Sequence, residues 1–446
     1  MPVSLGFAIL QKPAHLALND ALMSHNRRAF LKKMGHSTLG ALALPAFSPA
    51  LCDEVRAHAA LLDRRTPQDV ARDEDFWYTV QKAYTQSPHF INLESGYYSP
   101  APQEVLEAQL RNITMINETP SFYMRRRQEE DKAAVKQIVG DFAGVSPDEF
   151  VICRNTTEAL NTVIHGLELE PGDEALMCDR EYDSMLAAFR QRSRRHGLKL
   201  NIITLPLVPN SQDEIVRIYE AALTPKTKVL LVSHMIYLTG QVLPVRAICD
   251  MAHRRGIEVI VDAAHSFAHL DYKIPDLGAD YLGTSLHKWL CAPLGSGLLY
   301  VRKEKIDRVW PLFGDDTYAA DDIRKFEHIG THPCSTDLTI VNAIRFQEAI
   351  GGKRKEERLR FLKTYWVEQV KDLPHITINT PLGADQSCAL ANVAVAGMTS
   401  AEVVDALWDR HRIFTVAVEQ GARIAPNLWT RLAHLDALAE ALKEMA

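Results

Sequence analysis

The feature that most constrains the fold is a regular alternation of short β-rich runs and helical runs between about residues 100 and 300. Apolar runs bounded by turn residues predict strands, at 149–153, 174–178, 199–205, 229–234, 258–262, 280–284 and 297–301. Amphipathic segments with start and stop residues predict helices, at 155–167, 183–196, 212–223 and 245–255. Strands alternating with helices imply a mainly parallel sheet covered by helices on both faces, an α/β fold.

The pattern changes after about residue 330. Two charged helices are expected at 339–350 and 353–373, followed by a strand at 391–396, a helix at 400–411 and a closing helix after Trp429. We therefore expect four parts in the 446 residues: a signal region (1–50), an N-terminal segment (51–99), a large α/β domain (100–325) and a small C-terminal α+β domain (326–446).

Charge and cysteine content exclude some functions. The net charge of −6 argues against a nucleic-acid-binding protein, which needs a basic surface. The seven cysteines are scattered without a C-x-x-C pair, so neither a zinc site nor a disulfide framework is expected.

The N-terminal stretch has the pattern of an export signal. Arg27 and Arg28 are followed by Phe30-Leu31-Lys32, a moderately apolar run to Phe47 and a small residue at Ala50. This resembles a twin-arginine signal, which predicts a periplasmic protein exported in folded form. The alternatives are an amphipathic surface helix and a lipoprotein anchored at Cys52, although the bulky Leu51 disfavours the anchor.

Polar side chains follow several of the expected strands. In open α/β sheets, ligands bind beyond the carboxyl ends of the strands. Candidate residues in these places are Thr156 and Thr157 at a helix start, Tyr182, then Asp262 and His265, and finally Ser285, His287 and Lys288. Individually each has a structural alternative: an ordinary helix N-cap, or a lysine buried in a salt bridge.

Together these residues supply an anion cradle, an aromatic plate, a buried carboxylate and a buried amine on one sheet edge. Pyridoxal phosphate requires this set: a phosphate anchor, a ring stack, a partner for the pyridine nitrogen and an imine-forming lysine. The sequence therefore predicts a pyridoxal-phosphate site, and no metal site.

From about residue 90 onward the chain resembles the class V aminotransferases of fold type I, and their isopenicillin N epimerase-like branch in particular. The resemblance rests on N-T-T-E-A-L-N (155–161), D-R-E-Y (179–182), V-D-A-A-H-S (261–266), L-H-K-W-L-C-A-P-L-G-S-G (286–297) and R-I-A-P-N-L-W (423–429).

The resemblance implies a role for each matching residue. Lys288 would carry the cofactor covalently, Asp262 would pair with the pyridine nitrogen, His265 would approach the ring hydroxyl and Tyr182 would stack on the ring. The phosphate would be held by Thr156, Thr157, Ser285 and His287.

Two further roles come from the same resemblance. Arg423 would bind the substrate carboxylate through its guanidinium fork, and Thr331, after Gly330, would reach the phosphate of a neighbouring subunit in a homodimer.

Two departures from the family pattern matter. Tyr237 stands near the place where the family often has an asparagine, so its role is open. Cysteine desulfurases carry a nucleophilic cysteine shortly before the carboxylate arginine, whereas residues 414–420 contain none, which argues against desulfuration.

The resulting hypothesis is a pyridoxal-phosphate enzyme that acts at Cα of an amino acid, or of an amino-acid moiety in a peptide, by aminotransferase-type chemistry. Epimerisation uses the same residues and stays open, as does tailoring of an exported peptide such as a siderophore. A cofactor-binding protein without activity is the alternative from another class, disfavoured because both Lys288 and Arg423 are present.

Overall fold

The computed structural model describes residues 50–445 of the chain, so the twin-arginine prediction lies outside the described residues. Within them, the main sheet has seven strands in the order β2-β8-β7-β6-β5-β3-β4. Their bounds are β2 Phe150–Cys153, β3 Glu174–Cys178, β4 Lys199–Ile203, β5 Thr227–Ser233, β6 Glu258–Asp262, β7 Tyr281–Ser285 and β8 Gly297–Val301.

The sheet is mainly parallel, as predicted. Strands β3 to β7 pair in parallel, whereas β8 is antiparallel to both β2 and β7. Because β8 is antiparallel to both of its neighbours, β2 and β7 run in the same direction. The carboxyl ends of β2, β3, β6 and β7 therefore lie along one edge of the sheet, which is the edge where the candidate residues were expected.

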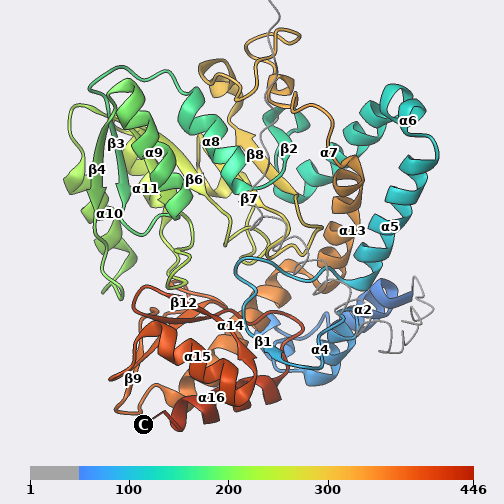
Figure 1. The fold of residues 1–446 in the computed structure, drawn as a ribbon, viewed down its shortest axis with the longest axis vertical. Helices are drawn as coiled ribbons and strands as arrows, with labels where there is room; N and C mark the ends of the chain where they lie inside the picture. The colour runs from blue at the N-terminus through green and yellow to red at the C-terminus, as the bar shows by residue number, and fades with distance from the viewer. Residues whose placement is uncertain (1–49, 446) are drawn as a thin grey trace, which may run out of the picture. The chain divides into compact units, whose positions relative to one another are not determined.

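Helices cover both faces of this sheet (Figure 1). Alternate side chains of β6 divide between the faces, since Ile260 packs with one apolar cluster and Val259 and Val261 pack with the other. The first cluster includes residues of α8 (Thr156–Gly166) and α9 (Asp183–His196). The second includes α7 (Gln128–Ala143), α10 (Gln212–Ala222), α11 (Val245–His253) and α13 (Cys334–Ile350).

A second, antiparallel sheet lies in the C-terminal part of the chain. Its order is β12-β13-β10-β9, and its core is shared with helices from both ends of the sequence. The bounds are β9 Ile376–Ile378, β10 Ala391–Val395, β12 Val416–Val418, β13 Gly421–Ile424, α14 Gly352–Val370, α15 Ser400–His411 and α16 Leu432–Lys443.

The N-terminal segment folds into short helices and one short strand. These elements are α2 Ala50–Leu61, α3 Pro67–Val70, α4 Glu74–Gln81 and β1 Ile91–Asn92, and helices α5 Gln103–Glu118 and α6 Pro120–Arg126 follow the segment. Strand β1 pairs in parallel with β11 (Ile413–Phe414), so the segment is joined directly to the C-terminal part (Figure 1). The predicted domain boundaries stay a prediction, because the described residues form a single compact unit.

The remaining short elements are α12 Ile274–Leu277 and three 3-10 turns at Pro147–Glu149, Lys303–Arg308 and Ile323–Phe326. All seven cysteines of the chain lie in the described part, and each is free and buried. None of the helices described between residues 50 and 445 is long and apolar enough to cross a membrane.

Candidate functional site

The centre of the candidate site is Lys288, in the turn between β7 and β8. Its side chain is buried, and its Nζ lies 3.3 Å from Nε2 of His265 and 5.9 Å from the centre of the Tyr182 ring. Burial lowers the pKa of Lys288 to about 8, although the nearby Asp262 opposes that shift. A lysine with such a pKa has a sizeable neutral fraction near neutral pH, as a nucleophile or base requires.

Asp262 ends β6 and is buried beside Lys288. One carboxylate oxygen accepts a hydrogen bond from the backbone N–H of Ala264 at 2.9 Å. Burial raises the pKa of Asp262, while the Ala264 N–H and the Lys288 charge act in the opposite direction. His265, three residues on, is also buried, and burial holds its pKa well below the usual range, so the ring is neutral.

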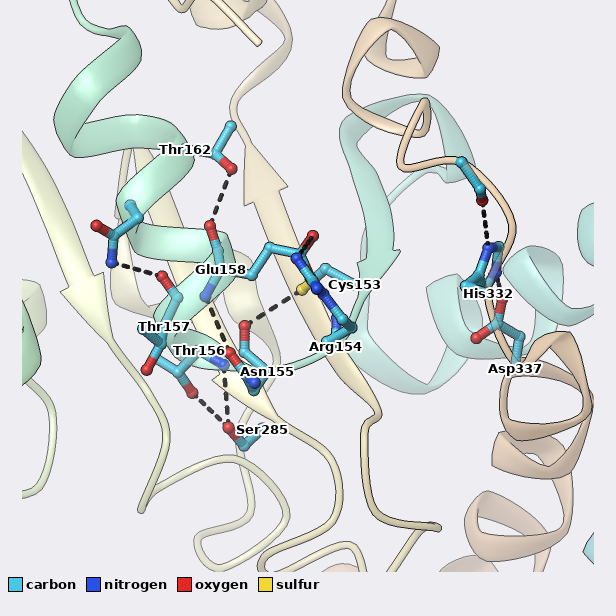
Figure 2. Close-up of polar contacts among 12 residues, drawn as sticks. Cys153, Arg154, Asn155, Thr156, Thr157, Glu158, Thr162, Ser285, His332 and Asp337 are labelled. Atoms are coloured by element: carbon cyan, nitrogen blue, oxygen red, sulfur yellow. Dashed lines mark hydrogen bonds and ion pairs between the residues drawn. The ribbon is translucent and has the colours of Figure 1, made fainter. Parts of the chain in front are cut away.

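The residues predicted to form an anion cradle lie together at the N-terminus of α8 (Figure 2). The Ser285 hydroxyl accepts a hydrogen bond from the backbone N–H of Thr156 at 3.0 Å and lies 2.7 Å from the Thr156 hydroxyl. Asn155 caps the helix through a bond from the N–H of Glu158 at 2.9 Å, and Thr157 is exposed beside it. Hydroxyls and amides at a helix N-terminus favour an anion such as phosphate.

Glycine at position 297 permits this arrangement. A Cβ atom at Gly297 would lie 2.7 Å from the backbone of Asn155, so a larger residue would push the start of α8 away from the sheet. The close approach of β8 to the helix N-terminus therefore depends on that glycine.

His287 and Thr331 occupy different surroundings. The Nδ1 of His287 lies 3.1 Å from the carbonyl of Ser296, and its ring stacks on Tyr98. Burial lowers the pKa of His287 to about 4, so the ring is neutral.

Thr331 is exposed on a loop whose next residue, His332, bonds to Asp337 at 3.0 Å (Figure 2). In a single chain Thr331 is not part of the cluster around Lys288, and its predicted contact with a partner subunit stays a prediction.

Arg423 lies on β13 and is completely buried. Its guanidinium is paired with Glu94 at 2.6 Å, and a further nitrogen donates to the carbonyl of Tyr237 at 3.1 Å. The open question about Tyr237 has a partial answer: its ring meets Tyr182 edge-on at 5.2 Å and its backbone holds Arg423.

Sequence reasoning missed two acidic residues here. Glu94 has no local pattern that betrays its partner, because Arg423 is 329 residues away. Glu181 follows β3, inside the D-R-E-Y motif, but only Tyr182 was singled out. Glu181 accepts a hydrogen bond from Ser233 at 2.5 Å, and burial raises its pKa to about 8, so the site holds a largely protonated carboxyl group near neutral pH.

Several buried polar atoms at this sheet edge have no partner among the described residues. They include Nδ1 of His265, Nδ1 of His234 and one carboxyl oxygen of Glu181. Buried polar groups are normally hydrogen-bonded, so this cluster is suited to receive a polar ligand.

The comparisons with known proteins agree with this geometry. The model of the family described as aminotransferase class-V matches residues 91–436. The isopenicillin N epimerases of Streptomyces clavuligerus and Amycolatopsis lactamdurans are 29% and 28% identical to the chain. These matches cover 82% and 83% of this chain, and 97% and 98% of the two relatives. A cysteine desulfurase of Haloferax volcanii is 26% identical over 76% of this chain and 81% of its own.

Solved structures share the fold. A complex of the cystine C-S lyase C-DES with cysteine persulfide has a TM-score of 0.73 and 22% identity, over 80% of this chain and 97% of that one. The cysteine desulfurase CsdA from Escherichia coli has a TM-score of 0.71 and 19% identity, over 83% and 98%.

Proposed function

The chain belongs to the class V aminotransferase family of pyridoxal-phosphate enzymes, and from this premise we propose that it transfers the amino group of an amino acid or of an amino-acid moiety in a peptide. The observation that carries the proposal is the buried Lys288, with a pKa of about 8, whose amine contacts His265 and is influenced by the charge of Asp262 at the carboxyl edge of the sheet.

The residues present fit pyridoxal phosphate. Among the described residues the amine of Lys288 has one hydrogen-bond partner, the imidazole of His265, and Asp262 offers a buried carboxylate for the ring nitrogen. The unpartnered Nδ1 of His265 offers a polar contact, and the start of α8 with Ser285 offers the phosphate cradle. When bound, this cofactor supplies an electron sink for negative charge that develops at Cα.

The chain's own residues then divide the work. Lys288 would hold the cofactor, and its amine, when free, would accept the Cα proton of the substrate. Asp262 would favour a proton on the ring nitrogen of the bound cofactor, because a buried carboxylate is stabilised by an adjacent cation. The helix N-terminus and the Thr156 and Ser285 hydroxyls fix the position of the phosphate.

Epimerisation is the second candidate. Its support is the similarity of the chain to two isopenicillin N epimerases, which match it over nearly their whole length. A second proton donor is then needed, and the Tyr237 hydroxyl is a candidate, since burial raises its pKa and keeps it protonated.

Desulfuration is not proposed, although desulfurases are among the relatives. Residues 414–420, which include β12, contain no cysteine, and every cysteine of the chain is buried.

Isotope exchange separates the two candidates. The cofactor-loaded protein would be incubated with single amino acids in deuterium oxide. Transamination releases a keto acid stoichiometric with the enzyme and bleaches the visible cofactor band. Epimerisation instead gives the opposite enantiomer with deuterium at Cα and no keto acid. If neither product forms with free amino acids or short peptides, the proposed function is wrong.

We also propose that the enzyme is a periplasmic homodimer exported by the twin-arginine route. The R-R-x-F-L-K stretch at 27–32 supports export. Support for a dimer comes from α5, where Leu106, Leu110 and Ile113 form an apolar stripe that is about half exposed in the single chain.

A further inference from the structure

Three of the five N–H groups of the Arg423 guanidinium are engaged by the chain itself. Nε and Nη2 donate to the two carboxylate oxygens of Glu94 at 3.1 and 2.6 Å, and Nη1 donates to the carbonyl of Tyr237 at 3.1 Å. The ring of Tyr97 covers one face, with its centre 4.1 Å from the guanidinium carbon. The bidentate edge of the guanidinium formed by Nε and Nη2 is therefore already occupied by a carboxylate.

Glu94 is held as firmly as Arg423. The backbone N–H of Tyr97 donates to the Glu94 carboxylate at 3.0 Å, and Glu94 forms a parallel bridge with Ala425 next to β13. Gly96 closes the turn, since a Cβ atom there would lie 2.9 Å from Nη2 of Arg423. Moving Glu94 away would leave a buried carboxylate unpaired, which is costly, so we expect the ion pair to persist when a substrate binds.

The ion pair borders the reacting centre. Tyr237, which accepts from Arg423, packs edge-on against Tyr182, and Lys288 lies over the Tyr182 ring. Arg423 and Glu94 also act on the pKa of Lys288 in opposite directions, since the arginine lowers it and the glutamate raises it. The charge of Arg423 is thus largely cancelled where the substrate binds.

We propose that Glu94 makes this corner of the site electrically neutral, so that the substrate presents a neutral acyl carbonyl to Arg423 rather than a free α-carboxylate. A free carboxylate would be the second anion on a guanidinium that is already paired, and two like charges in a buried site repel. A carbonyl oxygen accepts a remaining N–H without that penalty. The substrate class is therefore an aminoacyl amide, such as the N-terminal residue of a peptide. The inference rests on the proposed function, whose substrate it narrows.

The test compares free L-amino acids with their α-carboxamides, beginning with alanine and glutamate. Affinities are measured by titrating the visible cofactor band of the wild type, Glu94→Gln and Glu74→Gln. Glu74 is the matched control, because it also pairs with a fully buried arginine, Arg358, which otherwise contacts the N-terminal helices. Taking the ratio of the two affinities within each protein cancels global effects, and comparing that ratio between proteins cancels the different basicity of the two ligand amines.

The wild type should bind carboxamides more tightly than the free acids at equal concentrations of neutral amine. In Glu94→Gln the ratio should move at least tenfold toward the acids, and in Glu74→Gln it should not move. An unchanged ratio in Glu94→Gln overturns the proposal. So does a wild type that prefers the free acids, a result that needs no variant to fold. If neither ligand series perturbs the band of the loaded wild type, the proposed function itself fails and the inference falls with it.

Discussion

Lys288 has a pKa that chemistry can test before any substrate is known. Burial lowers it to about 8, so the side chain is mostly an ammonium below that pH and mostly a free amine above it. Only the free amine attacks an aldehyde. Covalent loading of the cofactor-free protein should therefore speed up by roughly tenfold per pH unit below pH 8 and level off above it.

The measurement is the rate at which the visible band appears between pH 6 and 9.5. Nα-acetyl-lysine is the control, because its ordinary amine, with a pKa of about 10.4, should show no plateau in this range. Lys288→Ala should load without a borohydride-reducible band. A band that survives in this variant would place the covalent link on another lysine.

At the scale of single residues, the sequence predicted the site residues that lie at or just after the ends of neighbouring strands. Asp262 and His265 follow one strand, and Ser285, His287 and Lys288 follow the strand beside it, so their proximity follows from a parallel sheet. The Glu94–Arg423 pair joins positions 329 residues apart, and no periodicity or motif connects them. The sequence identified Arg423 as a candidate residue, but the pairing of its guanidinium with Glu94 could not be predicted without the fold.

At the scale of elements, the N-cap residue Asn155 can have two roles that experiments distinguish: it can stabilise helix α8, and it can support binding of the cofactor phosphate. Asn155→Ala removes the cap of α8 and should cost about 1 kcal/mol of stability. In α10 the equivalent cap is Ser211, whose hydroxyl accepts a hydrogen bond from the N–H of Glu214 at 3.2 Å. Ser211→Ala should therefore lower the stability by a similar amount.

Only Asn155→Ala should also weaken cofactor retention, because only α8 begins at the cradle. Denaturant unfolding gives the stability of each variant, and dialysis against phosphate followed by spectroscopy gives cofactor retention. Equal retention in both variants would show that the cradle does not depend on this cap.

Elements with strong local patterns were predicted well. The expected bounds of β3, β6, β8, α9 and α15 agree with the structure. Helix α13, however, begins at Cys334, five residues before the expected start at Thr339. Ser335 and Thr336 are weak helix formers, yet both are buried in this helix, which packs beside α5 and α7, so tertiary packing overrides propensity. No elements were predicted in 51–99; the four-residue α3 is too short for a measurable periodicity, whereas the twelve-residue α2 was missed.

At the scale of the whole molecule, the export proposal has a direct test. Arg27→Lys with Arg28→Lys should leave the protein in the cytoplasm with its visible band intact, since the proposal gives these residues a role in export and none in cofactor binding. The matched control is Arg125→Lys with Arg126→Lys, an exposed arginine pair at the end of α6, which should be exported normally. Fractionation followed by immunoblotting measures both, and periplasmic accumulation of the first double variant would contradict the proposal.

The pairing of β1 with β11, and of Glu94 with Arg423, also determines how late during synthesis the site can be completed. At 5–20 residues per second, a ribosome needs roughly 15–70 seconds to make the 329 residues that separate the two partners. Lys288 is made 135 residues before Arg423, so for roughly the last 7–27 seconds of that interval a nascent chain holds Lys288 without the arginine that borders it. Capture of the cofactor in its final surroundings is therefore a late event, and chains released before Arg423 should bind pyridoxal phosphate loosely and lose it during purification.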